Sequence, residues 1–205
     1  MALASLLAAD AYLRPGEVLW LAGEDVVPAR AQFGEGFGAT ALLLFPEERG
    51  RASKTHMYND SVVLDSRHRG FLNRLVEALA ARRQGQALFN FTYIRWLGQF
   101  KAAAILAGLG KWDLTPYYLR HTGPSDDYLW KRRSLDEIQR RGRWAAESSV
   151  RRYEKSSRVT SRLNQLPAST LEFLRLADVR LQHALSRTGI GHLPALPRLR
   201  RSQKT

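Results

Sequence analysis

Hydrophobic residues recur along most of this chain three and four positions apart, the spacing that predicts amphipathic helices. The clearest stripes run over residues 71–79, 93–107 and 171–185. The alanine- and leucine-rich start, residues 2–22, also predicts helix, with a break at Pro15-Gly16. A further helix is expected over Glu147–Ser157. The chain is therefore expected to be largely helical.

Two short apolar runs depart from the helical spacing and predict buried strands, Ala41–Phe45 and Ser61–Leu64. Glycines mark a loop over residues 34–38, ahead of the first run. The segment Glu47–Tyr58 between the two runs predicts a hairpin that carries Lys54. Together these patterns predict a fold that is mainly α with a small antiparallel β-sheet, in the α+β class.

Local signals define helix ends in the second half of the chain. Thr115-Pro116 predicts a helix start, with threonine as the N-cap and proline in the first turn. Ser134 followed by Glu137 predicts a capping box, in which each side chain bonds the backbone of the other. The short helix that this box begins is expected to end at Gly142.

The charge balance is strongly basic. There are 32 lysines and arginines against 19 aspartates and glutamates, a formal net charge of +13, with a sequence pI near 10.7. Hydrophobic residues make up 44% of the chain, which is enough for a folded core. An excess of this size favours a polyanionic partner, with nucleic acid first and an anionic membrane second.

Other features of the composition exclude several classes. The chain has no cysteine, which excludes disulfide scaffolds, thiol catalysis and cysteine-based zinc sites. No segment approaches the ~20 apolar residues that cross a bilayer. The apolar start lacks a basic leading region, so we interpret it as a buried helix and not a signal peptide. No membrane partner is expected.

Cutting a DNA phosphodiester without a metal needs a nucleophile, cations on the non-bridging oxygens and an acid for the leaving 5′-oxygen. Arginine suits the second task because its planar fork meets two oxygens at once and keeps its charge. Tyrosine suits the first, since a phosphotyrosyl bond stores the energy for rejoining. The residues that match these tasks lie in Tyr12–Glu17, Thr115–Ser125 and Gly142–Tyr153.

These stretches resemble the sequence boxes of the tyrosine recombinases, the phage-integrase-like family. Leu119-Arg120-His121-Thr122 matches the second box, and Trp144 precedes Tyr153 by nine residues, as the last boxes require. Tyr12-Leu13-Arg14, with Glu17 three residues on, resembles the first box. The resemblance runs in the right order from about residue 10 to about residue 160.

The resemblance implies a role for each matching position. Tyr153 is expected to be the nucleophile, forming a 3′-phosphotyrosyl link, and Arg14 with Arg120 to clamp the scissile phosphate. Trp144 is expected to donate its indole N–H to the phosphate or to pack against Tyr153. Lys54, in the interval where the family carries its catalytic lysine on a hairpin, is expected to be the general acid.

The sequence departs from the family pattern at two points. Tyr117 stands where the family usually has a histidine, and a tyrosine of pKa near ~10 is a poor base at neutral pH. His121 follows Arg120, and its usual counterpart in the family is not the catalytic histidine. In addition, the first box begins within fifteen residues of Met1, so the family's N-terminal clamp domain is expected to be absent or lost by truncation.

The resemblance also implies an organisation and partners. Residues 1–190 are expected to form the integrase-like catalytic domain and residues 191–205 a basic flexible tail. Double-stranded DNA is the expected partner, with self-association as a tetramer on DNA through the C-terminal helix. The histidines lack ligand spacing and no phosphate-binding loop motif occurs, so no metal or nucleotide cofactor is expected. The expected location is the nucleus of a eukaryotic host, otherwise the cytoplasm or nucleoid.

Three charged runs carry a simpler interpretation. Asp126-Asp127 is expected to be the polar face of a helix and not a metal site. Lys131–Arg133 and Arg140-Arg141 are expected to be solvated faces, which on a DNA enzyme would follow the phosphate backbone.

Three other functions remain open from the sequence. A decayed recombinase would keep the fold and basic surface as a DNA-binding module without turnover, which Tyr117 and the missing clamp domain favour. An RNA-associated basic structural protein would show no convergence of Arg14, Arg120 and Tyr153. A type IB topoisomerase would use the same chemistry, although the Leu119–Thr122 box fits recombinases better.

Overall fold

The computed structural model describes residues 1–50, 52, 58–154 and 156–187. Its α-helices are α1 (Ala2–Asp10), α2 (Pro15–Trp20), α3 (Phe71–Ala81), α4 (Tyr93–Leu106), α5 (Leu119–Leu129), α6 (Leu135–Gly142), α7 (Ser156–Leu163) and α8 (Ala168–Arg187). Its strands are β1 (Val26–Val27), β2 (Ala41–Leu44) and β3 (Asp60–Val63). Short 3₁₀ turns join them: η1 (Gly23–Asp25), η2 (Ala31–Phe33), η3 (Glu35–Phe37), η4 (Glu47–Arg49), η5 (Arg67–Arg69), η6 (Gly110–Trp112), η7 (Pro116–Tyr118), η8 (Glu147–Ser149) and η9 (Arg151–Glu154). The predicted α+β class with a small antiparallel sheet is confirmed.

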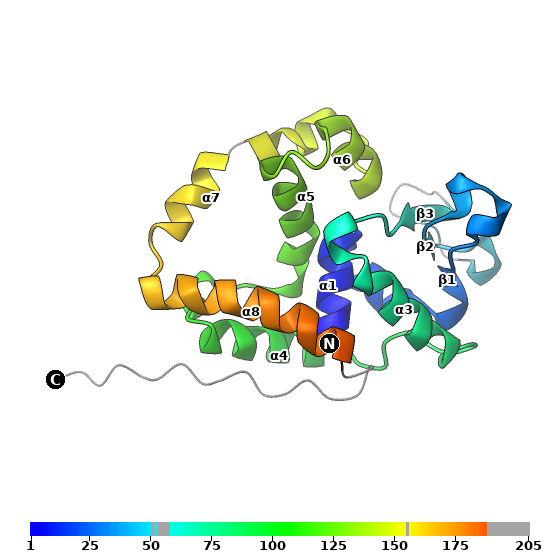
Figure 1. Ribbon diagram of the computed structural model, residues 1–205, viewed down its shortest axis with the longest axis horizontal. Coiled ribbons are helices and arrows are strands. Elements are labelled where there is room, and N and C mark those ends of the chain that lie inside the picture. Colours follow the sequence, from blue (N-terminus) through cyan, green and yellow to red (C-terminus); the bar gives the residue numbers. More distant parts are fainter. Residues whose placement is uncertain (51, 53–57, 155, 188–205) are drawn as a thin grey trace.

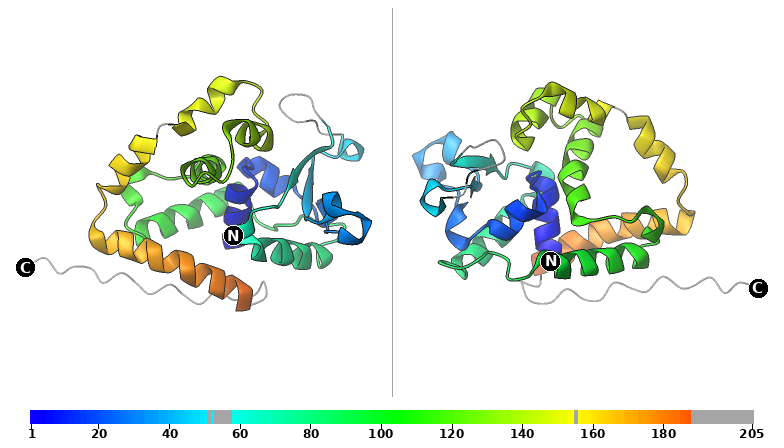
Figure 2. Two further views of the ribbon diagram at one scale, coloured as in Figure 1. Left: turned by 45° about the horizontal axis from the view of Figure 1, so that its top comes forward. Right: turned by 180° about the vertical axis from the view of Figure 1, so that it is seen from behind.

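Helix α1 lies at the centre, with the sheet and α3 on one side and α5 on the other (Figure 1). It packs against α5 so closely at Gly123 that a Cβ there would lie 1.9 Å from the Ala9 carbonyl oxygen. Helix α6 follows α5 at the top of the view, and α7 leads away to α8, which contacts α3 (Figures 1 and 2). At the start of α8, Thr170 lies against Gly108, just beyond the end of α4.

The three strands form one antiparallel sheet in the order β1-β2-β3. Leu42 is the central residue, since it pairs with Val26 on one side and Val62 on the other. All three side chains are buried, while their neighbours along the strands are more exposed, the alternation expected when one face of a sheet packs on a core. Strands β2 and β3 confirm the two predicted runs, whereas β1 is too short to leave a pattern in the sequence.

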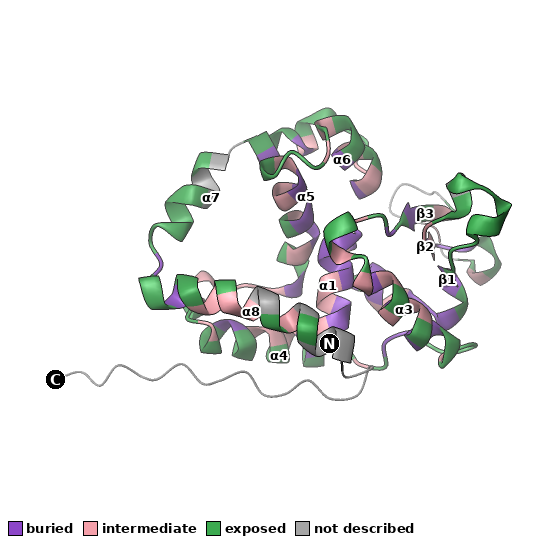
Figure 3. Ribbon diagram, viewed as in Figure 1, coloured by how far each residue is buried: buried purple, intermediate pink, exposed green. Residues whose placement is uncertain are grey.

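The main hydrophobic core joins α1, the sheet and the inner faces of α3 and α4. Figure 3 shows the buried positions concentrated along α1 and on the sides of its neighbours that face it. Leu7, Val18, Leu42 and Val76 are fully buried there, and the Trp96 ring closes the core from α4. Among the described residues, no helix combines the length and the apolar character needed to cross a bilayer.

A second, smaller cluster joins α5, α6 and η9. Its buried members are Tyr12, Ile138, Val150 and Tyr153, and the partly buried rings of Tyr128 and Trp144 pack against it. This cluster contains aromatic residues from both ends of the proposed family match. It therefore brings segments more than 130 positions apart in the sequence into one structural unit.

The predicted break in the first helix is displaced. Helix α1 ends at Asp10, before the expected break at Pro15-Gly16, and Pro15 instead begins α2. Tyr12 takes a left-handed backbone conformation, with φ of 53°, which reverses the chain between the two helices. Proline fits the first position of α2 because its missing N–H has no partner there.

The prediction of one helix over residues 147–157 is wrong. The chain forms the 3₁₀ turns η8 and η9 instead, and α7 begins only at Ser156. Val150 and Tyr153 are both buried, three residues apart. A 3₁₀ turn places residues at this spacing on the same side, so both side chains reach the second cluster.

The predicted ends of α6 are confirmed. Ser134 accepts the backbone N–H of Glu137, and the Glu137 carboxylate accepts the backbone N–H of Ser134, and the helix ends at Gly142. Thr115 occupies the predicted N-cap position, ahead of η7, but its side chain makes no capping hydrogen bond. The prediction that Pro116 occupies the first turn is correct.

Candidate active site

Glu17 gathers three arginines from distant parts of the chain around one buried carboxylate. Arg14 caps α2, and its Nη1 lies 2.7 Å from Glu17 Oε1. Arg143, just after α6, and Arg120, near the start of α5, approach Glu17 Oε2 at 2.8 and 3.5 Å. Arg143 also pairs with Asp60 at 3.3 Å, so two carboxylates face three guanidiniums, and one positive charge in excess is available to an anion.

Arg120 is held by the backbone as well as by charge. Its Nη1 donates to the carbonyl oxygen of Tyr12 at 2.5 Å, and its Nη2 donates to that of Gly142 at 2.6 Å. The Trp144 ring lies over the guanidinium, 4.9 Å from ring centroid to Cζ, and the side chain is 1% exposed. Burial lowers the pKa of Arg120 to about 10, so it stays charged at neutral pH.

Tyr12 is fixed at both ends. Its carbonyl oxygen accepts a hydrogen bond from Arg120 Nη1, and its hydroxyl donates one to Asp127 Oδ2 at 2.5 Å. Burial, followed by the bond to Asp127, raises the pKa of the Tyr12 phenol well above its usual range. Arg133 donates to the same Asp127 oxygen at 2.9 Å, which keeps that buried carboxylate paired. The left-handed backbone at Tyr12 is therefore stabilised from α5 and from the turn after it.

Tyr153 is a buried member of the second cluster, and its hydroxyl lies against the His121 ring. Its hydroxyl oxygen lies 2.8 Å from His121 Nδ1, and its ring lies 5.7 Å from the Trp144 ring. Burial raises the pKa of Tyr153 to about 12, while the guanidiniums of Arg152 and Arg120 act in the opposite direction. The site thus contains a protonated phenol beside cations that favour its ionised form.

The His121 imidazole lies among three aromatic rings. It is stacked on Trp144 at 6.4 Å between centroids with a 19° interplanar angle, and Tyr117 meets it edge-on at 5.3 Å. Burial lowers the pKa of His121 to about 4, and Arg152 and Arg120 add to the effect. The ring is therefore neutral at pH 7 and has a nitrogen free to accept a proton.

The structure brings five of the six predicted site residues into one region: Arg14, Tyr117, Arg120, Trp144 and Tyr153. The sixth, Lys54, lies outside the described residues. The prediction that Trp144 packs near Tyr153 agrees with the geometry, whereas the chemical roles of all six stay predictions.

Sequence reasoning gave no role in the site to His121, Tyr12 or Arg143. His121 could have been found from its place beside Arg120 in the second box, and Glu17 belongs to the first box. The contribution of Tyr12 is a backbone carbonyl, for which side-chain identity gives no signal. Arg143 lies between Gly142 and Trp144 in the last matching stretch, where the pattern indicates no function for it.

Part of the basic surface expected from the sequence is turned inward. Arg133 lies 2.5 Å from Asp65, and Arg141 lies 3.0 Å from Asp65 and 3.5 Å from Asp10. The interpretation of these runs as solvated faces is wrong for Arg133 and Arg141, because both are largely buried in ion pairs. Asp126 and Asp127 lie on α5, as expected of a polar face of a helix, but Asp127 is buried there against Tyr12.

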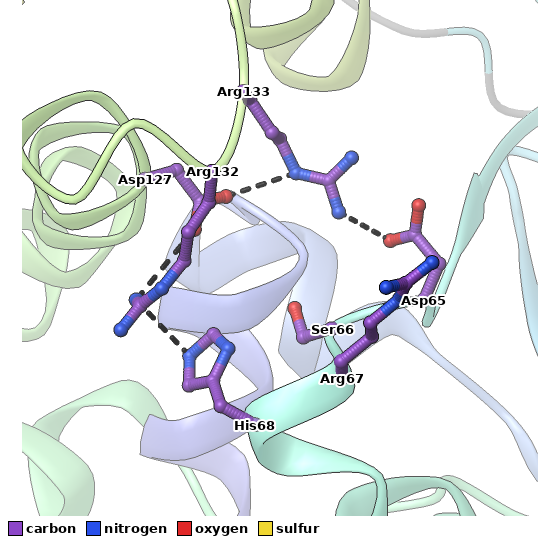
Figure 4. A pocket seen from close by; sticks show the side chains of 7 residues that line it. All are labelled: Asp65, Ser66, Arg67, His68, Asp127, Arg132 and Arg133. Carbon is purple, nitrogen blue, oxygen red and sulfur yellow. Dashed lines mark hydrogen bonds and ion pairs between the residues drawn. The ribbon is translucent and has the colours of Figure 1, made fainter.

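A pocket of about 460 Å³ lies beside these ion pairs, between the loop before α3 and the turn after α5 (Figure 4). Arg132 bridges Asp126, at 2.6 Å, and His68, at 3.3 Å. The pocket is lined by Asp65, Ser66, Arg67, His68, Asp127, Arg132 and Arg133. Its two carboxylates, Asp65 and Asp127, are already paired with arginines. We therefore assign these ion pairs a structural role, in which they hold α5 against the loop between β3 and α3.

No protein-family model and no curated protein sequence matches this chain. Among solved structures, the chain is similar to the XerH site-specific recombinase bound to its difH substrate, in a pre-cleavage complex. The match has a TM-score of 0.52 and 21% sequence identity, and it covers 74% of this chain and 41% of the XerH chain. The chain therefore has the fold of a tyrosine recombinase catalytic domain, as the sequence boxes predicted, and it spans less than half of the XerH chain.

Proposed function

We propose that this chain is a DNA breaking-and-rejoining enzyme, a site-specific recombinase that acts through a 3′-phosphotyrosyl intermediate. One observation carries the proposal. Arg14, Arg120 and Tyr153, which are far apart in the sequence, converge in one site within a fold shared with a recombinase that binds DNA. An RNA-associated structural protein would have no reason to assemble this set, so the arrangement favours the recombinase over that alternative.

Arg14 and Arg120 bind the non-bridging oxygens of the scissile phosphate in this mechanism. The Arg14 side chain is 31% exposed and meets an incoming phosphate first, whereas Arg120 lies behind it under Trp144. Two carbonyl bonds use two of the five Arg120 N–H groups, and the phosphate is bound by the others in the proposed mechanism. Charge that builds on the phosphate is stabilised most strongly where water is excluded.

The Tyr153 hydroxyl oxygen attacks phosphorus, a bond forms between them, and the bond from phosphorus to the 5′-oxygen breaks. The leaving oxygen takes a proton and becomes a 5′-hydroxyl, with Lys54 as the proposed donor. The protein–DNA bond retains the energy of the broken bond, so a 5′-hydroxyl can later reverse the step without a nucleotide or metal cofactor.

Double-stranded DNA is the proposed partner, and the net charge of +13 supports it. Strand exchange needs four copies on two duplexes, and we assign the tetramer contact to α8. In the structure α8 contacts α3 of its own chain. Leu171 on α8 is 39% exposed and is available to a neighbouring copy.

The test is covalent trapping on DNA. Duplexes of randomised sequence, nicked so that the cleaved fragment diffuses away, are incubated with the chain, and covalent complexes are isolated under denaturing conditions and sequenced. A recombinase gives complexes that are lost in Tyr153→Phe. Equal DNA binding by both proteins without any covalent complex would support the decayed module instead, and relaxation of a supercoiled plasmid would indicate a topoisomerase.

A further inference from the structure

The proposed cleavage needs an acceptor for the proton of the Tyr153 phenol. Tyr117, at the position where a histidine was expected, is unsuited to this task, because a phenol is a poor base at neutral pH. Its ring is 48% exposed and contacts the edge of His121, and no hydrogen bond to Tyr153 is found for it. The acceptor must therefore be another group within reach of the phenol oxygen.

We propose that His121 is the catalytic base of this site, accepting the Tyr153 proton at Nδ1. This inference rests on the proposed recombinase function. Nδ1 already lies 2.8 Å from the phenol oxygen, within the range for direct proton transfer, and no intervening water is needed. Stacking on Trp144 and the edge contact with Tyr117 hold the ring in this orientation.

The proton moves together with the attack on phosphorus. In the free protein the pKa values of about 12 for Tyr153 and about 4 for His121 keep the proton on the phenol. The charged groups that face His121 are Arg120 on α5 and Arg152 on η9, and both lower its pKa. A bound phosphate adds negative charge beside these guanidiniums and raises the pKa of His121. Formation of the bond to phosphorus meanwhile makes the phenol oxygen far less basic.

The proton balance closes in both directions. In cleavage, the Tyr153 proton passes to Nδ1 and leaves an imidazolium, while the 5′-oxygen is protonated from the acid. In rejoining, the 5′-hydroxyl attacks phosphorus, the tyrosyl oxygen leaves, and the imidazolium returns its proton to that oxygen. His121 therefore acts as base in one direction and as acid in the other.

The first measurement is the single-turnover rate of covalent complex formation on a nicked duplex recovered by the trapping selection. His121→Ala and His121→Gln are expected to slow this rate about 10²–10⁴-fold, the range for loss of a general base, with DNA affinity within about twofold of the parent. His68→Gln is the matched control and keeps the parent rate, because His68 lies on η5 beside Arg132 and has no part in the proposed chemistry.

The second measurement separates proton transfer from simple positioning. Fluorinated tyrosine is placed at position 153, which lowers the pKa of the phenol and reduces its need for a base. The defect of the His121 variants is expected to shrink at least tenfold with this nucleophile. A merely structural contact predicts the same defect with either phenol, and that result would overturn the inference.

The outcomes distinguish the two proposals. If the parent protein forms covalent complexes and His121→Gln forms them within threefold of the parent rate, the inference about His121 is wrong and the recombinase proposal stands. If the parent forms none on any duplex, the proposed function fails and the inference fails with it. If His121→Ala loses DNA binding through misfolding, the decision is made on His121→Gln and the fluorinated nucleophile.

Discussion

Glu17 shows how a single residue organises this site. It is buried, and Arg14, Arg120 and Arg143 all approach it within 3.5 Å. Three guanidiniums at this distance would repel one another without a shared counter-charge. Glu17 also accepts a hydrogen bond from the backbone N–H of Arg14 at 2.7 Å. The same carboxylate therefore stabilises the start of α2 and orients the arginines that are proposed to bind the phosphate.

Replacing this carboxylate tests its importance. Glu17→Gln keeps the size of the side chain but removes the charge that Arg14 and Arg120 share, while Arg143 keeps its pair with Asp60, and we expect a loss of about 3 kcal/mol in the free energy of unfolding. The measurement is urea denaturation. Glu172→Gln is the matched control, because Glu172 pairs with Arg175 on the exposed surface of α8 and such pairs contribute ~0–1 kcal/mol. Equal losses in the two variants would contradict the proposed role.

At the scale of residues, the sequence could predict side chains in recognisable boxes but not backbone groups. Arg120 and Tyr153 follow from box spacing. The carbonyls of Tyr12 and Gly142 that hold Arg120 do not, because every residue has a carbonyl and only the fold determines where it points. His121 was visible within its box, yet its hydrogen bond to Tyr153 depends on η9, which the sequence did not predict.

At the scale of elements, the junction after α6 does most to shape the site. The helix ends at Gly142, Arg143 takes a left-handed conformation with φ of 54°, and Trp144 folds back over the helix end. A Cβ at Gly142 would lie 1.8 Å from the Trp144 ring. Trp144 can therefore cover Arg120 only because residue 142 has no side chain.

This close approach predicts the effect of one methyl group. Gly142→Ala must displace the Trp144 ring or shift the end of α6, and we expect it to destabilise the protein by about 1–3 kcal/mol, as overpacking does. Thermal unfolding of both variants measures this. Gly98→Ala is the control, because Gly98 lies within α4 with open space around it and alanine there should stabilise the helix by about 0.5–1 kcal/mol. A Gly142→Ala protein as stable as the parent would show that Trp144 does not pack there.

Elements with a long periodic stripe were predictable, and elements made by tertiary packing were not. Helices α3, α4 and α8 form where the periodic hydrophobic residues predicted helices. The two-residue strand β1 exists because β2 offers it a hydrogen-bonding edge, which no local pattern reveals. Turn η9 stands where a helix was predicted, and it places the side chains of Val150 and Tyr153 in the second cluster, a tertiary contact that no local pattern reveals.

At the scale of the whole molecule, the positive charge has two different uses. Arg120, Arg133, Arg141 and Arg143 are turned inward, where they bind carboxylates and carbonyls. The net charge of +13 therefore overstates the cations that can meet a DNA backbone from the surface. Composition predicted the polyanionic partner, but only the fold separates the arginines that build the site from those free to contact phosphates.

Two histidines with lowered pKa values, His121 and His68, predict how the stability of the molecule depends on pH. The folded-state pKa of His121 lies at about 4, below its ordinary value of about 6.5, so between these pH values the unfolded chain binds more protons than the folded one. The free energy of unfolding therefore falls as pH decreases through this window, by less than about 1.4 kcal/mol per pH unit for this group. Burial, with Arg69 and Arg132, lowers the pKa of His68 in the same direction.

Urea denaturation of the parent and of His121→Gln, from pH 7 down to pH 5, measures this contribution. The variant should lose stability less steeply, because one group that takes up a proton on unfolding has been removed. His68→Gln measures the contribution of the second histidine to this pH dependence. Of the four proteins, the double variant should show the smallest change in the free energy of unfolding between pH 7 and pH 5. Parallel curves for the parent and His121→Gln would mean that His121 is already solvated in the folded protein. In that case its imidazole would no longer be the neutral, oriented acceptor that the Tyr153 phenol requires.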